Sequence, residues 1–567
     1  MKLHAPGWVT SYRRGQLPGD LVAALVVTML LVPQGLAYAS LAGLPPELGL
    51  YASVLPMVAY AIFGTSMMLS VGPVAVTALM TASALAPIAA PGSPEYIAGA
   101  IVLALLSGLM LFAFGLLRLG QLARLLSHPV INGFISGAAI LIIIGQLRPL
   151  FGIQSGGDTA VELVWQLLKS AASAEPLTSA IGVTALLLLW LARRHLGGWL
   201  ERAGMPAPQA TLLSRMAPMV VVLLAAAGVA IAGLGDQIAV VGSLPSGLPR
   251  LVWPAMDWSL LSALWLPALI ISLITFVESV AIAQAFARQA GVRIDPNAEL
   301  RGLGAANLAS AFSGAFPVTG GFSRTVVNAE AGARTPLAGV LAAGFMVIVL
   351  LFATGLFRSL PNTVLAAVII IAAFGLVDVK GLKHAWHFDR LEGIAFGGTA
   401  LGVLVSGVET GVVFGVVFSL ALLVWRASHP HLAVMGRMPG SEHFRNVLRH
   451  PEVECDPHLV IVRVDENLFF GNAEGIEERL FAIVDEHPEA KHLILVMSSV
   501  SHVDATAADM LEYLNATLGE RGIRLHLAEV KGPVMDRLEA GTLLGHLSGE
   551  VFLSTHAAMC QLSSAAR

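Results

Sequence analysis

The sequence predicts a multi-span α-helical membrane protein followed by a small α/β domain. Of its 567 residues, 56% are hydrophobic and only 12% are charged. A soluble domain carries about 25% charged residues, so this chain has too few charges to cover a water-facing surface. Apolar runs of membrane-spanning length repeat as far as Arg426, and beyond it strand-like and helix-like patterns alternate.

The evidence for the spans is a series of apolar runs of about 20 residues, the length that crosses a bilayer as a helix. Hydropathy alone predicts about twelve to fourteen spans. The run at 394–425 is long enough for a hairpin of two, and runs beginning near Val71 and Leu303 are interrupted by Pro and Gly. The other runs begin near Leu21, Leu48, Ile97, Val130, Ile181, Ala217, Leu260, Leu337 and Val364.

Basic residues in the loops predict the orientation, because cytoplasmic loops collect Lys and Arg. With fourteen spans and the N-terminus inside, most of these residues fall on the inner side. They are Arg118, Arg124, Arg193, Arg194, Arg202, Arg215, Arg288, Arg293, Arg301, Lys380 and Lys383. The N-terminal segment lacks the short apolar core and cleavage site of a signal peptide. We therefore expect a multi-pass protein of the plasma (inner) membrane with both termini in the cytoplasm.

The composition changes sharply near Arg426 and divides the chain. We expect a transmembrane domain over residues 1–426, a linker over 427–457 and a cytoplasmic domain over 458–567. In the last of these, LVIVRV (459–464) and HLILVM (492–497) are typical of strands buried on both faces. The two cysteines show no metal-ligand spacing, no basic run suggests nucleic acid, and neither a metal nor another cofactor is expected.

Two segments combine a broken apolar pattern with polar groups: SVGPVAVTAL (70–79) and SGAFPVTGGFSRTVVN (313–328). Unpaired backbone is costly in hydrocarbon, so such a stretch persists only where it is buried in protein or lines a cavity. A half-helix that begins there directs its N-terminal amides, with their partial positive charge, at the gap. Paired interrupted segments in the two halves of a transporter indicate its substrate site.

Arg324 and Glu278 are the charges predicted at bilayer depth. A cation there costs at least about 2.5–3.5 kcal/mol unless it meets water or a partner. Beside a helix N-terminus Arg324 would attract an anion, a role favoured by Gly320, Gly321 and Ser323; alternatively it reaches an interface or pairs with an acid. Glu278 is a candidate proton-coupling carboxylate, a partner for Arg324 or a structural hydrogen-bonding group, and the sequence does not rank these roles.

Four stretches carry a resemblance to the sulfate permease (SulP) family. They are LVPQGLAYASLAGLPPELGLY (31–51), SVGPVAVT (70–77), the run 278–333 and NTVLAAVIIIA (362–372). The resemblance covers nearly the whole chain. It implies fourteen spans in two inverted seven-span repeats, with the third and tenth spans meeting as half-helices around the anion. It also implies a core that moves against a gate, in a homodimer.

Positions in these motifs supply the site residues that the resemblance implies. The substrate-binding residues are Gln34, Tyr38, Val71, Gly72, Pro73, Gly320, Gly321, Phe322, Ser323 and Arg324. Glu278 stands where family members carry an acid on the eighth span and is the coupling residue. In sodium-coupled bicarbonate members of the family, the eighth span has a pattern of Asp followed four residues later by Thr, and the tenth span also has a Thr. This chain has Glu278, Ile282 and Phe322 there, which favours proton symport or anion exchange over a sodium site.

The C-terminal domain resembles the STAS fold of anti-sigma factor antagonists. Its stretch SHVDATAADML (501–511) is similar to the loop that holds a phosphorylatable Ser or Thr at a helix start. The resemblance places Thr506 at the phosphoacceptor position, as a regulatory phosphosite, with Asp504 capping the helix. Ordinary capping chemistry explains the same residues. A cytoplasmic partner would bind this domain.

The function that follows is secondary active transport of a small inorganic anion, with sulfate preferred, by proton symport or anion exchange. Alternatives are a bicarbonate or C4-dicarboxylate transporter and an uncoupled anion channel. No GxxxxGK[ST] motif is present for an ATP-driven pump, and no nucleophile or histidine-ligand pattern indicates an enzyme. A membrane-anchored STAS receptor would not need interrupted spans, and a STAS domain disfavours nucleobase–cation symport. Expected partners are the anion, protons or a counter-anion, and the lipid bilayer.

Overall fold

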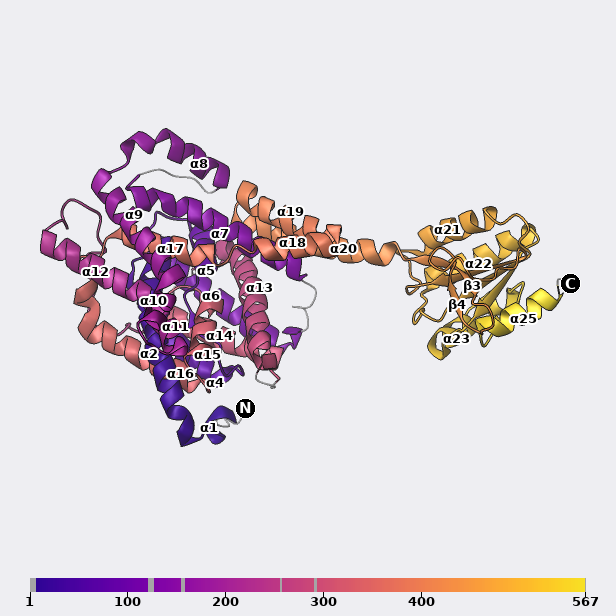
Figure 1. Cartoon of the computed structure of the whole chain (residues 1–567), viewed down its shortest axis with the longest axis horizontal. Coiled ribbons are helices and arrows are strands. Elements are labelled where there is room, and N and C mark those ends of the chain that lie inside the picture. The colour runs from indigo at the N-terminus through magenta and orange to yellow at the C-terminus, as the bar shows by residue number, and fades with distance from the viewer. Residues whose placement is uncertain (1–6, 121–126, 154–158, 255–256, 290–292, 566–567) are drawn as a thin grey trace. The chain divides into compact units, whose positions relative to one another are not determined.

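The computed structural model describes residues 7–120, 127–153, 159–254, 257–289 and 293–565 (Figure 1). The chain forms two compact units, Met1–Ser419 and Leu420–Arg567. Helix α20 (Val408–Ser428) contains both the change of unit and Arg426, where the sequence predicts the end of the transmembrane domain. The predicted limits of the domains and of the linker stay predictions.

Within the described residues, seven helices of the first unit are long and apolar enough to cross a membrane. They contain α2 (Leu17–Leu41), α6 (Pro94–Leu116), α7 (His128–Phe151), α9 (Pro176–Leu191), α13 (Trp258–Gln289), α16 (Leu337–Ile348) and α17 (Asn362–Phe374). A pair bent by 45°, α11 (Ala207–Arg215) and α12 (Ala217–Ala232), passes the same test together. The predicted helical membrane domain is therefore confirmed.

The count of fourteen spans stays a prediction, because the other apolar runs form shorter pieces. The run near Leu48 forms α3 (Glu47–Tyr51) and α4 (Leu55–Phe63), and the run near Val71 forms strand β1 (Val71–Gly72) and α5 (Ala75–Leu85). The run near Leu303 forms α14 (Pro296–Phe312), followed by strand β2 (Thr319–Gly320) and α15 (Phe322–Glu330). Extended backbone at β1 and β2 leaves α5 and α15 too short to cross a bilayer alone.

The run at 394–425 forms two helices, α19 (Arg390–Ser406) and α20, as the sequence predicts for a hairpin. Gly407 separates them, and its φ of 85° is a conformation that glycine adopts without strain. A Cβ built on Gly411 would lie 2.7 Å from the Val403 Cα, and one on Gly415 would lie 3.0 Å from the Thr399 Cγ2. The two helices therefore fold back closely on one another.

Glycines also bring α6 and α14 into close contact. A Cβ on Gly108 would lie 2.7 Å from the Leu308 amide nitrogen, and one on Gly304 would lie 2.6 Å from that of Phe112. Such close approach is how helices associate in lipid, where apolar side chains gain little by leaving the bilayer. The remaining helices of the unit are short: α1 (Gly7–Thr10), α8 (Ala160–Lys169), α10 (Gly197–Arg202) and α18 (Val379–Phe388).

The second unit is built on a six-stranded sheet in the order β4-β3-β5-β6-β7-β8. Its strands are β3 (Leu432–Arg437), β4 (Phe444–Asn446), β5 (Leu459–Val464), β6 (His492–Val496), β7 (Arg524–Ala528) and β8 (Val551–Phe552). Strands β5 to β8 are parallel, whereas β3 runs antiparallel to both of its neighbours. Residues 427–457, predicted as a linker, thus contribute β3 and β4 to this sheet.

Helices cover both faces of that sheet (Figure 1). One face packs against α21 (Ala473–Asp485), α22 (Ala505–Glu520), α23 (Gly532–Glu539) and α24 (Leu543–His546). The other packs against α25 (Thr555–Ala565) through Ala558, Met559 and Leu562. Burial on two faces explains why β5 and β6 read as near-continuous apolar runs.

Candidate functional site

The two interrupted segments meet inside the first unit. Strands β1 and β2 pair antiparallel, with Val71 opposite Gly320 and Gly72 opposite Thr319. Helices α5 and α15 begin directly beyond these strands, so their N-termini lie on either side of one short ladder. Neither helix has a side-chain cap at its N-terminus. Backbone amides in these first turns are therefore donors without an intrahelical partner, and they carry partial positive charge.

Arg324 links the two segments. Its side chain is buried, with 2% of its surface exposed, and its Nη1 donates to the Pro73 carbonyl at 2.5 Å. Its Nε and Nη2 are buried without a hydrogen-bond partner. Buried donors are nearly always satisfied in folded proteins. Two unsatisfied donors on one guanidinium thus indicate a position for an acceptor, and a guanidinium suits an oxyanion best.

Glycines make room for that guanidinium. A Cβ built on Gly321 would lie 3.0 Å from the Arg324 Nη2, and one on Gly72 would lie 3.4 Å from the same atom. Leu31 of α2 also lies 3.5 Å from the Cβ position of Gly72. Any larger residue at Gly321 would therefore press on the guanidinium of Arg324.

Tyr38 and Glu278 are two further predicted residues with buried side chains, exposed by 6% and 8%. They belong to α2 and α13, and both interact electrostatically with Arg324. Among the described side chains, however, Glu278 and Arg324 form no ion pair, and Glu278 Oε2 is buried without a hydrogen-bond partner. The sequence left open that Glu278 forms an ion pair with Arg324, and the structure does not show such a pair.

Glu278 also borders a small cavity of about 30 Å³. The cavity lies between α13 and three other helices, which contribute Phe134, Thr399 and Gly415 among their lining residues. Apart from Glu278 and Thr399 its lining is apolar, so the carboxylate of Glu278 meets a largely apolar environment where it borders this cavity.

Three predicted site residues, Gln34, Phe322 and Ser323, are more accessible. Phe322 is 53% exposed and Ser323 is exposed, although both stand in the first turn of α15. Gln34 is half-buried and lies four residues before Tyr38, on the same face of α2. The structure thus brings together Arg324, the two strand segments, Tyr38 and Glu278, and leaves Phe322 and Ser323 at an accessible edge.

Several residues that hold the site together were missed by the sequence reasoning. The Ser279 hydroxyl accepts from the Gly320 amide at 3.0 Å and lies 2.9 Å from the Thr319 hydroxyl. Asn307 exchanges two 2.9 Å hydrogen bonds with the backbone of Val318. An amide side chain within a predicted span was a signal that could have identified Asn307, because buried polar groups in membranes require partners.

A buried acid, Glu299, was missed as well. It is fully buried on α14 and accepts hydrogen bonds from the Tyr60 hydroxyl, the Thr65 hydroxyl and amide, and the Ser66 amide. These four donors satisfy the carboxylate and fix the loop that leads into β1. Its role is therefore to position the interrupted segment.

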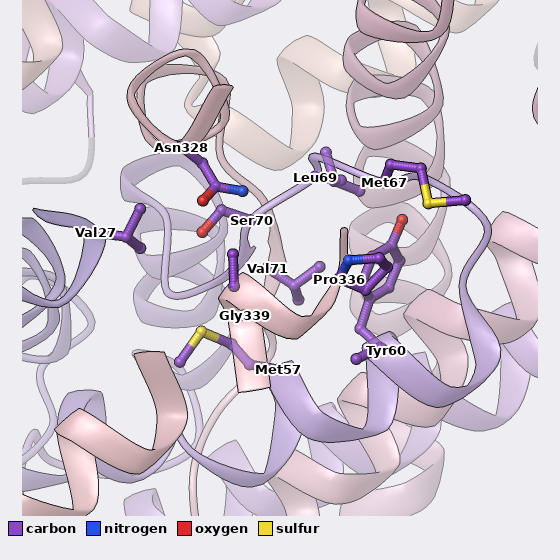
Figure 2. A pocket seen from close by; sticks show the side chains of 12 residues that line it. Val27, Met57, Tyr60, Met67, Leu69, Ser70, Val71, Asn328, Pro336 and Gly339 are labelled. Carbon is purple, nitrogen blue, oxygen red and sulfur yellow. The ribbon is translucent and has the colours of Figure 1, made fainter. Parts of the chain in front are cut away.

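A cavity next to β1 is shown in Figure 2. Ser70 and Asn328 lie close together on one side of it, Met57 lies on another, and Val71 and Tyr60 also line it. Its volume of about 10 Å³ admits roughly one water molecule. It is too small for an oxyanion, so the unpartnered donors of Arg324 are the better indication of where an anion binds.

In the second unit, Asp504 caps α22 by accepting from the Ala507 amide at 2.9 Å. Its other oxygen accepts from the Phe470 amide at 2.8 Å. Thr506 is exposed in the first turn of α22. Asp504 is thus an ordinary N-cap of α22. Phosphorylation of Thr506 stays a prediction.

Comparison with known proteins gives the family. Residues 17–399 match the model of the sulfate permease family and residues 450–558 match that of the STAS domain. The chain belongs to the sulfate permease family. The recognition made from the sequence motifs is confirmed, as is the membrane domain followed by a STAS domain.

Relatives along the whole chain carry sulfate in their names. A "probable sulfate transporter" of Mycobacterium tuberculosis is 37% identical over 554 residues, 97% of this chain and 96% of its own length. "Sulfate transporter 4.1, chloroplastic" of Arabidopsis thaliana is 36% identical over 535 residues, 92% of this chain and 76% of its own.

Solved structures show the same fold. Murine solute carrier 26 member A9, an anion transporter in an inward-facing state, matches with a TM-score of 0.87 and 21% identity, over 98% of this chain and 93% of its own. The transmembrane domain of the cyanobacterial bicarbonate transporter BicA matches with a TM-score of 0.60 and 22% identity, over 72% of this chain and 98% of its own.

Proposed function

We propose that this permease-family protein is a secondary active transporter of a small inorganic anion, with sulfate as its substrate. The observation that carries the proposal is Arg324, whose Nε and Nη2 are buried and unpartnered where the uncapped α5 and α15 begin. Sulfate offers several oxygens to such donors. Relatives at 37% and 36% identity are named as sulfate transporters, which favours this substrate over bicarbonate or a C4-dicarboxylate.

The proposed substrate residues are those of the two interrupted segments and of α2 around Arg324. Arg324 would bind the anion directly, together with the backbone of Gly320 and Gly321 and the first turns of both half-helices. Tyr38 and Gln34 would line the approach from α2. Val71, Gly72 and Pro73 would set the shape of the facing segment, while Phe322 and Ser323 would border its accessible edge.

Glu278 is the proposed coupling residue. Its Oε2 has no partner and it makes no ion pair with Arg324 among the described side chains, so its charge is not fixed by a neighbour in contact. A carboxylate whose charge is not held by an ion pair can take up and release a proton. This supports proton symport; anion exchange is the alternative mode of the same transporter.

The packing of the helices supports two inverted repeats. If α2 and α6 in the first half correspond to α13 and α16 in the second, the contact between α2 and α16 has its counterpart in that between α13 and α6. Likewise α7 and α17 pack against each other, and β1 pairs with β2. Exchanging the halves leaves these contacts unchanged, as fourteen spans in two seven-span repeats require.

The remaining parts of the proposal concern placement and assembly. We place the protein in the plasma (inner) membrane with cytoplasmic termini, as a homodimer that binds a cytoplasmic partner through its STAS domain. We assign no enzymatic activity. A membrane-anchored receptor is disfavoured because the buried Arg324 and paired half-helices serve no anchoring purpose.

Purified protein in liposomes tests the function. Labelled sulfate uptake would be measured with and without an inward proton gradient, in competition with unlabelled sulfate, bicarbonate, chloride and succinate. We expect sulfate to compete best and the gradient, or an internal counter-anion, to drive accumulation. Binding without flux would contradict the transporter, and equal competition by bicarbonate would contradict the substrate.

A further inference from the structure

A second feature of the first unit lies apart from the anion site. A groove of about 580 Å³ runs between α9 and α17, which pack side by side (Figure 1). Its lining residues are Leu186, Leu187, Trp190, Arg193, Arg194, Ile371 and Phe374. This volume is within the range of small-molecule binding sites.

The groove is charged at one end only. Arg193 and Arg194 stand in the π-helical turn Ala192–Leu196 that continues α9. Arg193 Nη1 donates to the Ile371 carbonyl at 2.6 Å, which fixes that guanidinium at the rim while using one of its five N–H donors. The Arg194 guanidinium lies 5.5 Å from the centre of the Trp190 ring. Both cations are thus held at the groove by contacts with its own walls.

The rest of the groove is apolar and accessible. Leu187 is 53% exposed and Phe374 is 59% exposed. From Leu187 to Arg194 the helix advances seven residues, about 10 Å along its axis. A ligand that follows this groove therefore needs an anionic end and an apolar tail of at least that length.

Aromatic residues mark the charged end as the membrane interface. His195 stacks on Trp199 with ring centres 5.9 Å apart and meets the Trp190 ring edge-on at 6.3 Å. Tryptophans gather where hydrocarbon meets headgroups. In the part of the chain that the structure describes, neither Arg193 nor Arg194 contacts a carboxylate, so both charges are available to a headgroup phosphate.

We propose that this groove binds an anionic glycerophospholipid of the inner leaflet. Arg193 and Arg194 hold its phosphate, and one acyl chain lies along Leu187, Trp190 and Phe374. Basic pockets between membrane helices on the cytoplasmic side recognise such headgroups. The bound lipid would bridge α9 and α17 at the place where Arg193 already joins them.

Native mass spectrometry of the full-length protein tests the site. Delipidated protein would be titrated with phosphatidylglycerol or with phosphatidylcholine of the same acyl chains, and retained lipid would be counted. The variants are Arg193→Gln with Arg194→Gln, and Arg194→Gln alone, which leaves the Arg193–Ile371 bond intact. Arg202→Gln, an exposed arginine of α10 outside the groove, is the matched control.

A basic residue near an anionic surface changes binding by about fivefold. We expect phosphatidylglycerol to bind about fivefold more weakly to the single variant and about 30-fold more weakly to the double variant, with the control unchanged. Equal retention by double variant and control would overturn the proposal. So would equal retention of phosphatidylcholine, or displacement of the lipid by millimolar inorganic phosphate, which would indicate a site for free phosphate.

Discussion

The guanidinium of Arg324 makes one structural hydrogen bond and keeps two buried donor nitrogens without a partner. One nitrogen is satisfied by the Pro73 carbonyl, whereas Nε and Nη2 are buried without partners. Leaving a buried donor unsatisfied costs about 1–3 kcal/mol, and more when the group is charged. An oxyanion that accepts from both nitrogens removes this cost, so the side chain favours the occupied site over the empty one.

Replacement of Arg324 by Ala is expected to reduce sulfate uptake at least about 100-fold, because two charge-assisted hydrogen bonds and the fixed charge are lost. Arg324→Lys should recover part of the activity, since it keeps the charge but not the planar fork of donors. Initial uptake rates in proteoliposomes provide the measurement, and gel filtration checks folding. Arg358→Ala, at an exposed position, is the control. Near-normal uptake by Arg324→Ala would contradict the assigned role.

Glu278→Gln should remove the pH dependence of uptake. If Glu278 carries the coupled proton, wild-type uptake is faster at acidic external pH, and an amide that cannot titrate leaves rates that differ by less than about twofold between pH 5.5 and 7.5. Uptake at those two pH values gives the answer. Glu201→Gln, exposed on α10, should behave like the wild type. A Gln variant that keeps the full pH dependence would assign coupling to another group.

At the scale of elements, the contact between α6 and α14 predicts a steric limit at Gly304. An added Cβ would lie 2.6 Å from the Phe112 amide nitrogen, too close for any rotamer change to relieve. Gly304→Ala should therefore lower stability by about 1–3 kcal/mol through overpacking. Gly344→Ala in α16, where nothing lies within 4 Å of the added atom, is the matched control. Thermal unfolding in detergent compares them, and equal melting temperatures would refute the close packing.

In the STAS sheet, β7 buries His526, whose side chain is 2% exposed. Its Nδ1 accepts from the Glu550 amide at 3.0 Å, and its Nε2 lies 2.9 Å from the His492 Nδ1. Burial, with the nearby charges of His492 and Arg524, lowers the pKa of His526 to about 4. In the unfolded chain this imidazole has a pKa near 6.5. Between about pH 6.5 and 4 the unfolded state therefore binds a proton at His526 that the folded state does not bind.

The stability of the second unit should consequently fall as the pH is lowered through that window. From His526 alone we expect a loss of about 2 kcal/mol between pH 7 and pH 5. Pulse proteolysis of the full-length protein in urea measures it. His526→Gln should flatten the dependence, whereas His443→Gln, at an exposed histidine, should preserve it. A slope unaffected by His526→Gln would show that other groups are responsible.

The elements show how far sequence reasoning reaches. Interrupted segments could be located because Pro73 and Gly320 stand within apolar runs, which is a local property. The pairing of β1 with β2 and the contact of Arg324 with Pro73 could not, because they depend on how distant segments pack. Strands β3 and β4 were not predicted and lie within the predicted linker, for a similar reason: short strands acquire their stability from neighbours across the sheet.

At the scale of the whole molecule, the predicted even number of spans is what would link topology to regulation. Only an even count places the STAS domain on the same side as the N-terminus, where cytoplasmic partners could reach it. The structure describes seven span-length helices and an eighth bent one, with the other candidate spans broken into shorter pieces. The sidedness of the loops is therefore the direct test of fourteen spans.

The chain's two cysteines make that test simple, since Cys455 and Cys560 are both exposed in the second unit. In intact cells a membrane-impermeant maleimide should leave them unlabelled, and permeabilisation should label them. Ser173→Cys, introduced with Cys455→Ser and Cys560→Ser, places a thiol in the exposed turn between α8 and α9. In the fourteen-span topology five spans precede this turn, so it should be labelled from outside without permeabilisation. Labelling of Cys560 in intact cells, together with labelling of the Ser173→Cys thiol from outside, would put an even number of spans between the two positions. Fourteen spans require nine there, so the two seven-span repeats would have to be abandoned.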